Sequence, residues 1–91
     1  MPSDPEFAQM EKETFEKVSV TLSAIDRAVS AWNASRIKPQ DMGERIERLR
    51  RFQSSLNSWI KEFSRVKSAS KERRLENLGK FIEICYSYEY S

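Results

Sequence analysis

The chain has 91 residues, of which 38% are hydrophobic and 33% are charged, and it contains two glycines and three prolines. This composition favours one small domain of long helices with charged surfaces over a β-sheet or a disordered chain. Sixteen basic and fourteen acidic residues give a net charge of +2, which is too small to indicate a nucleic-acid-binding protein from charge alone.

Several classes of site are excluded by residue types and motifs that the sequence lacks. It has no histidine and one cysteine, Cys85, which excludes an internal disulfide and the usual Cys/His zinc sites. No phosphate-binding glycine-rich loop is present, and Cys85 falls on an apolar helix face without a base nearby, which is typical of a structural thiol. We therefore expect a non-enzymatic protein with no metal, no cofactor and no small-molecule substrate.

The sequence also bears on the compartment. It contains no apolar run of about 18 residues and no signal-peptide pattern. Together with the single thiol, this favours a soluble protein in the cytoplasm or in another reducing intracellular compartment.

A first helix is predicted from about residue 5 to residue 36. Asp4 or Ser3 can cap its start, and Pro5 suits its first turn. The apolar residues then follow alternating steps of three and four, which is the heptad spacing of helices that pack side by side: Phe15, Val18, Leu22, Ile25, Val29 and Trp32.

A second helix is predicted from about residue 39 to residue 67. Pro39 disfavours helical geometry at Lys38 but is compatible with the first position of a new helix. This is the one segment with enough apolar side chains to contact neighbours on two sides, so we place it in the middle of the fold. One column is Met42, Ile46, Leu49, Leu56, Ile60 and Phe63, and a second adds Phe52, Trp59 and Val66.

A third helix is predicted from about residue 71 to residue 86, followed by a tail of residues 87–91. Ser68 and Ser70 can cap its start. Its expected apolar face consists of Leu75, Leu78, Ile82 and Cys85, widened by Phe81 and Tyr86. The alternative is a second helix that continues without interruption to Tyr86, because no proline or glycine lies between Gly43 and Gly79.

The pairing of apolar residues supports an antiparallel arrangement. Matched positions have nearly constant sums of residue numbers in both helix pairs, and across the second turn these pairs include Leu56 with Ile82 and Phe52 with Tyr86. The acidic start of the first helix would also lie beside basic residues at that turn: Lys61, Arg65, Lys67, Lys71, Arg73 and Arg74. We therefore predict an all-α single domain, residues 1–91, folded as an antiparallel up-down-up three-helix bundle with coiled-coil-like packing.

The third helix is too short to cover the whole hairpin formed by the first two. The apolar residues and arginines at the uncovered end have the composition of a protein interface: Val29, Trp32, Ile37, Met42, Arg45, Ile46 and Arg48. We expect a protein-protein interaction module, a scaffold or adaptor, that docks a partner helix or a second copy of itself there, the latter giving a homo-oligomer.

An alternative function follows from the basic run in the second helix. Its arginines could neutralise the phosphates of nucleic acid or of an anionic membrane: Arg45, Arg48, Arg50 and Arg51. Glu44 and Glu47 offset two of these charges through i,i+4 pairs, which favours a solvated helix face. Nucleic acid and membrane are therefore the less favoured partners.

The segment Trp32-Asn33-Ala34 beside the first predicted turn resembles the Trp-x-Gly turn of the small helical-hairpin proteins of type VII secretion. Alanine stands where that family has glycine, and no Tyr-x-x-x-Asp/Glu motif follows it. The resemblance covers this segment alone, and no site residue is carried over from it.

Overall fold

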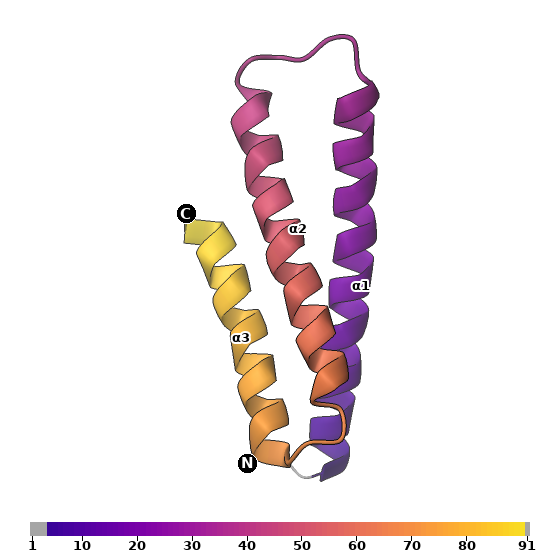
Figure 1. The fold of residues 1–91 in the computed structure, drawn as a ribbon, viewed down its shortest axis with the longest axis vertical. Coiled ribbons are helices and arrows are strands. Elements are labelled where there is room, and N and C mark those ends of the chain that lie inside the picture. Colours follow the sequence, from indigo (N-terminus) through magenta and orange to yellow (C-terminus); the bar gives the residue numbers. More distant parts are fainter. Residues whose placement is uncertain (1–3, 91) are drawn as a thin grey trace.

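The computed structural model describes residues 4–90, which form three α-helices and two short connections. The helices are α1, Asp4–Ala34; α2, Met42–Arg65; and α3, Lys71–Tyr90. Among the described residues 86% are helical and none is in a strand. Helix α2 contacts both α1 and α3 (Figure 1), which confirms the predicted all-α three-helix bundle with the second helix in the middle.

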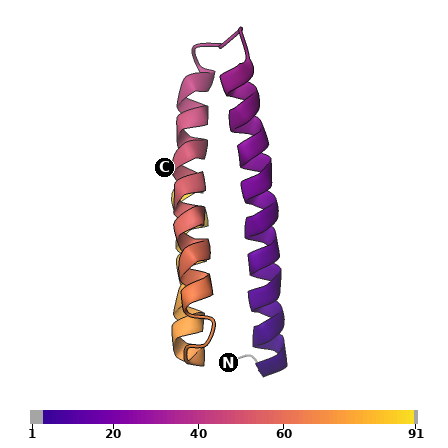
Figure 2. The ribbon, with the colours of Figure 1, turned by 45° about the vertical axis from the view of Figure 1, so that its right-hand side comes forward.

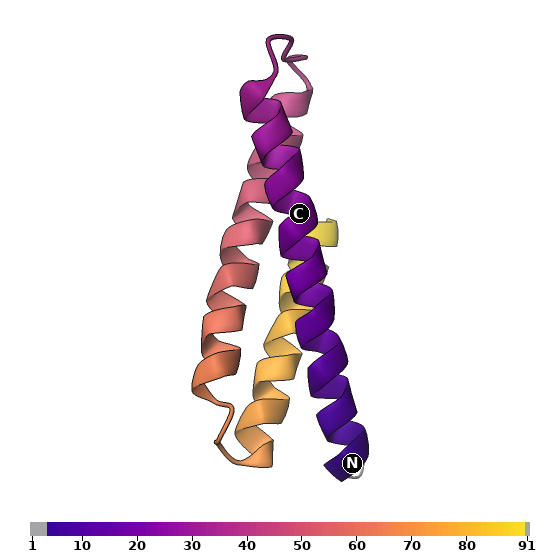
Figure 3. The same cartoon turned by 90° about the vertical axis from the view of Figure 1, so that its right-hand side faces the viewer.

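The bundle is elongated because its helices run nearly parallel to one long axis. The molecule measures 50 × 22 × 19 Å. Helices α1 and α2 lie side by side along most of their length (Figure 2), and α3 runs along one end of that pair (Figure 3). At about 1.5 Å per residue, the 31 residues of α1 span about 46 Å and the 20 residues of α3 about 30 Å. Helix α3 therefore ends well short of the connection at residues 35–41.

The first connection is longer than predicted. Helix α1 ends two residues before the expected boundary and α2 begins three residues after it. Pro39 lies in the connection, where its carbonyl accepts a hydrogen bond from the N–H of Met42 at 3.1 Å. The N–H of Ser35 donates to the carbonyl of Trp32 at 3.2 Å, and this i→i−3 bond closes the last turn of α1.

The second connection, residues 66–70, separates α2 from α3. A single helix running to Tyr86 is therefore the wrong alternative. Ser70 caps α3 as expected, because its Oγ accepts a hydrogen bond from the N–H of Arg73 at 3.3 Å. The predicted tail is wrong, since residues 87–90 belong to α3; residue 91 lies outside the described residues. No proline or glycine follows Gly79, and contacts with α2 hold the last turns.

The core lies along the inner faces of all three helices. Phe7, Val18 and Leu56 are at most 1% exposed. Apolar side chains of this size each contribute about 1.5–3 kcal/mol when buried, so packing outweighs the low helix propensity of β-branched residues in α1. The buried cluster contains residues from every helix: Phe7, Val18, Ile25, Leu56, Trp59 and Leu78.

The face that α3 turns to the core differs from the predicted one. Leu78 is buried as expected, but Ile82 is 67% exposed and Tyr86 is 64% exposed. The predicted pairing of Leu56 with Ile82 and of Phe52 with Tyr86 is therefore wrong. Helix α3 is rotated about its axis relative to the arrangement that a strict heptad predicts.

Aromatic contacts with α2 account for this rotation. The ring centroid of Phe81 lies 5.5 Å from that of Trp59, and the ring of Tyr88 stacks on Phe52 at 4.3 Å. Aromatic side chains bury more area than aliphatic ones and gain further from ring contacts. Burying Phe81 is thus more favourable than burying its neighbour Ile82, which heptad spacing alone does not distinguish.

The acidic start of α1 lies beside the basic start of α3, as the charge pattern predicts. Lys71 Nζ is 3.0 Å from Asp4 Oδ1, and Arg74 Nη1 is 3.3 Å from Glu11 Oε1. Both cations also lie over the ring of Phe7, at 5.5 and 5.2 Å from its centroid. A pair with an exposed partner, such as Lys71 with Asp4, contributes little stability, and together the two pairs favour one orientation of α3 against α1.

Candidate functional site

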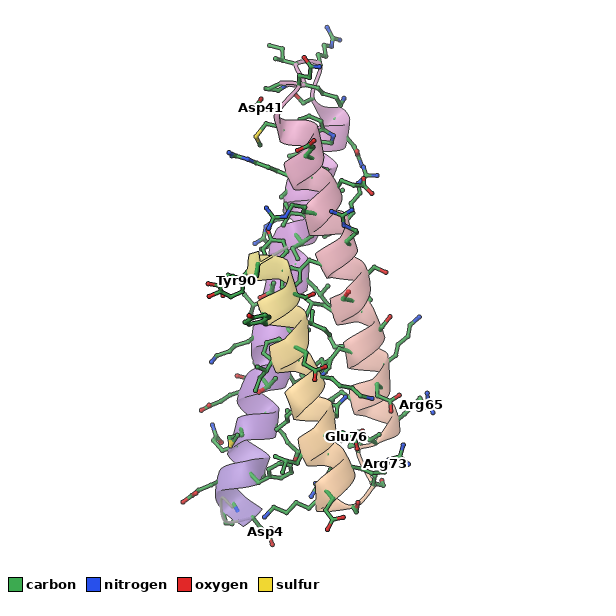
Figure 4. The ribbon with its side chains drawn as sticks, turned by 90° about the vertical axis from the view of Figure 1, so that its left-hand side faces the viewer. Asp4, Asp41, Arg65, Arg73, Glu76 and Tyr90 are labelled. Atoms are coloured by element: carbon green, nitrogen blue, oxygen red, sulfur yellow. The ribbon has the colours of Figure 1, made fainter. Side chains whose placement is uncertain are left out.

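The candidate site is the end of the α1–α2 hairpin that extends beyond α3, at residues 29–46, which we call the open end. Asp41 stands at the tip of the hairpin, and Tyr90, the last described residue of α3, stops far below it (Figure 4). Near the end of α3, Tyr88 contacts Arg48 and Phe52 of α2. Beyond that level the hairpin consists of two helices.

The apolar residues predicted to bind a partner lie at the open end with different exposures. Ile37 is 80% exposed in the connection, and Val29, Trp32 and Met42 are half-buried. Ile46 is only 6% exposed, which corrects the prediction for this residue. It lies on the inner face of α2, so it supports the surface from within the bundle and does not reach a partner.

Local hydrogen bonds shape the connection that joins the two helices. Ser35 Oγ donates to the carbonyl of Ile37 at 2.7 Å, and Lys38 Nζ donates to the carbonyl of Ser35 at 2.7 Å. The same ammonium group lies 5.9 Å from the centre of the Trp32 ring. The connection therefore places a cation beside the half-buried indole and leaves Ile37 in solvent.

Arg48 joins α2 to α3, which also corrects its predicted role. Its Nη2 donates to the backbone carbonyl of Tyr88 at 2.7 Å, and its guanidinium lies 5.2 Å from the centre of the Tyr88 ring. Carbonyls in the last turn of a helix lack helical partners and carry partial negative charge. Because α3 has no basic residue in its own last turn, Arg48 supplies one from α2 and favours helix up to Tyr90.

Removing this cation tests its role. We expect Arg48→Ala to make the amides of residues 86–90 exchange about tenfold faster, because a hydrogen bond from a charged donor contributes about 1.5–3 kcal/mol. Native-state hydrogen exchange followed by NMR measures this. Arg45→Ala removes the same charge one turn earlier and should leave α3 unchanged. Equal protection of α3 in both variants would contradict the proposed cap.

The other three arginines of the basic run point to different neighbours. Arg50 Nη2 donates to Asn33 Oδ1 on α1 at 2.9 Å, Arg45 Nη1 approaches the sulfur of Met42 at 4.0 Å, and Arg51 faces α3. The run thus forms no continuous basic face. This geometry favours neither nucleic acid nor an anionic membrane, which are bound by cations that gather on one side.

Cys85 is half-buried on α3. Burial raises the pKa of its thiol above the ordinary value, and a thiol that stays protonated at neutral pH is a poor nucleophile. Because the thiol loses its proton less readily in the folded chain than in the unfolded chain, its ionisation lowers the free energy of unfolding only at alkaline pH. The surroundings of Cys85 therefore do not activate its thiol as a nucleophile.

A groove between α2 and α3 is a feature that sequence reasoning missed. It has a volume of about 570 Å³. Basic and aromatic side chains from both helices line it, an arrangement that depends on how α3 is rotated. Its lining residues are Arg48, Arg51, Phe52, Ser55, Lys80, Glu83, Ile84, Ser87 and Tyr88.

Comparison of the chain with protein-family models, with curated proteins and with solved structures finds no match. Among residues 4–90, no helix has the length and apolar character needed to cross a membrane. The same residues contain no group of three or more Cys, Asp or Glu side chains placed to hold a metal ion. Function has to be inferred from the shape and charge of the surface.

Proposed function

We propose that this chain is a non-catalytic helical interaction module that docks an acidic, amphipathic helix of a partner protein on the open end of its α1–α2 hairpin. One observation carries the proposal: accessible apolar side chains, Trp32, Ile37 and Met42, remain beyond the end of α3. Below that level α3 packs against α2.

The shape of the open end suits a helix. Lower in the molecule α3 packs on α2, and its axis points along the hairpin towards the open end (Figure 1). A partner helix that continued this path would run beside the first turns of α2, which begin at Met42. Helices that dock in this way present apolar residues at spacings of three and four, and a tryptophan in the receiving surface is typical of an interface hot spot.

Charge favours an acidic partner. The open end, residues 29–46, carries three basic and two acidic side chains, a net charge of +1. Its net charge is therefore positive, and one of its cations, Lys38, lies beside the Trp32 ring. Complementary charge accelerates association and excludes partners of like charge.

The same charge argues against a second copy as the occupant. A two-fold dimer through the open end would bring two surfaces of the same net charge, +1, together, because the same patch faces itself across a two-fold axis. Repulsion between them would oppose association. We therefore assign the open end to a different protein, and a homodimer is an outcome that would count against this assignment.

Selection from a display library of helical peptides tests the proposal with defined probes. We expect the enriched peptides to be amphipathic and acidic, and Trp32→Ala to weaken their binding by at least about tenfold, since hot-spot tryptophans contribute about 2 kcal/mol or more. Ile82→Ala, an exposed apolar residue on α3, is the matched control and should leave affinity unchanged. Peptides without net negative charge, or binding indifferent to Trp32→Ala, would overturn the proposal.

A further inference from the structure

The groove between α2 and α3 lies on a different part of the molecule from the open end. Its volume of about 570 Å³ falls within the range of about 300–1,000 Å³ that is typical of small-ligand sites. The residues of α3 that line it extend from Lys80 to Tyr88, which corresponds to about 12 Å along the helix axis. The groove is therefore long enough for an elongated small molecule.

The floor of this groove is apolar. Phe52 of α2 and Tyr88 of α3 stack with ring centroids 4.3 Å apart, and Ile84 adds an aliphatic side chain from α3. Ser55 and Ser87 also line the groove. A ligand with an apolar body would gain by covering this floor, because transfer of apolar area from water is favourable.

The walls of the groove carry excess positive charge. Three of the lining residues are basic and one, Glu83, is acidic, a net charge of +2. Arg48 is engaged with the carbonyl of Tyr88. None of the ion pairs formed within residues 4–90 involves Arg51 or Lys80, so these two cations are available to an anion.

The two arginines define where an anionic group would lie. Arg48 and Arg51 are three residues apart on α2 and therefore face the same side of that helix. The C-terminal end of α3 is nearby, and its partial negative charge would oppose an anion. Arg48 offsets this charge by donating to the Tyr88 carbonyl, which leaves Arg51 to pair with a carboxylate in the two-pronged geometry that guanidinium groups favour.

We infer that the α2–α3 groove binds a small amphiphilic anion of the fatty-acid class. The carboxylate lies at Arg51, and the alkyl chain runs over Phe52 and Ile84 towards Lys80. This ligand covers the apolar side chains and pairs with Arg51, whereas inorganic phosphate would leave the apolar side chains exposed and a neutral hydrocarbon would leave Arg51 unpaired. The site is independent of the proposed docking of a partner helix.

Calorimetric titration with decanoate, below the concentration at which it forms micelles, tests this inference. We expect saturable binding that Arg51→Gln weakens by about three- to fivefold, the effect of losing one exposed charge pair. Glu83→Gln should strengthen binding by a similar factor, because it removes the one acidic wall residue. Arg65→Gln makes the same charge change at the far end of α2 and is the matched control; far-UV circular dichroism establishes that each variant is folded.

Three further titrations separate the possible sources of binding. Decyl phosphate should also bind, since it shares the anionic head and apolar tail, whereas inorganic phosphate should not. Decyltrimethylammonium carries the same tail with the opposite charge and should bind more weakly than decanoate. Equal binding of decanoate and decyltrimethylammonium, no saturable binding of decanoate, or equal effects of Arg51→Gln and Arg65→Gln would overturn the inference.

Discussion

Replacing Trp59 with alanine is expected to lower the free energy of unfolding by about 3–5 kcal/mol, the usual range for a large aromatic residue in a core. Trp59 is 3% exposed, and its ring centroid lies 5.1 Å from that of Phe63 and 5.5 Å from that of Phe81. Its indole N–H donates to the backbone carbonyl of Asn77 at 2.7 Å. The variant thus loses ring contacts within α2 and with α3, together with a buried hydrogen bond.

Urea unfolding followed by circular dichroism measures this loss, and the second tryptophan provides a matched control. Trp32 is half-buried at the open end, so Trp32→Ala should cost no more than about 1.5 kcal/mol. The contrast also separates folding from binding, because the same Trp32→Ala variant is the one expected to lose the partner. Equal destabilisation by the two changes would contradict the packing of α3 on Trp59.

Leu56→Ala is expected to cost about 2–5 kcal/mol, the range measured for leucine-to-alanine changes in close-packed cores. Leu56 has no exposed surface and lies in the buried cluster to which all three helices contribute. Alanine would leave a cavity there that the surrounding helices fill only in part. Small domains have limited stability, so this variant should be partly unfolded at physiological temperature.

Ile82→Ala is the control for Leu56→Ala, because a heptad predicts that these two residues face each other. Since Ile82 is 67% exposed, its replacement should change stability by no more than about 0.5 kcal/mol. Both variants can be compared in the same urea titration. If Ile82→Ala were as destabilising as Leu56→Ala, α3 would have the rotation that the heptad predicts, and the groove beside Phe52 would not exist as described.

Most of the fold follows from local signals in the sequence. Steps of three and four between apolar residues identify the seam of α1, and the two columns of α2 place it between the other helices. Pro39 and Ser70 mark the two connections, although Pro39 precedes α2 instead of beginning it. The two connections can be predicted from the sequence because proline geometry and helix capping depend only on neighbouring residues.

The rotation and length of α3 depend on contacts that the sequence pattern does not reveal. Phe81 and Ile82 fit the apolar spacing almost equally well, and the choice is made by Trp59 on another helix. The last turn of α3 is held by Arg48, a residue 40 positions earlier in the chain. The spacing of apolar residues describes one helix at a time, so it does not predict which side chains of different helices are in contact.

The candidate sites show the same division. The existence of an open end follows from the lengths of the helices, but individual residues do not: Ile46 is buried and Arg48 contacts α3. The groove brings Arg51 and Lys80 to one cavity, although they lie on different helices and stand in no recognisable motif. Only the rotation of α3 places them together.

Titration of the isotope-labelled chain with an acidic amphipathic helical peptide, obtained by selection and followed by NMR, tests the central claim most directly. The amide signals of residues 29–46 and the indole N–H signal of Trp32 should shift saturably, while the amide signals around Leu56 and Leu78 stay unchanged. Trp32→Ala should raise the peptide concentration needed for half-saturation by at least about tenfold. Shifts confined to α3, or a peptide that binds without moving any signal of residues 29–46, would contradict the account.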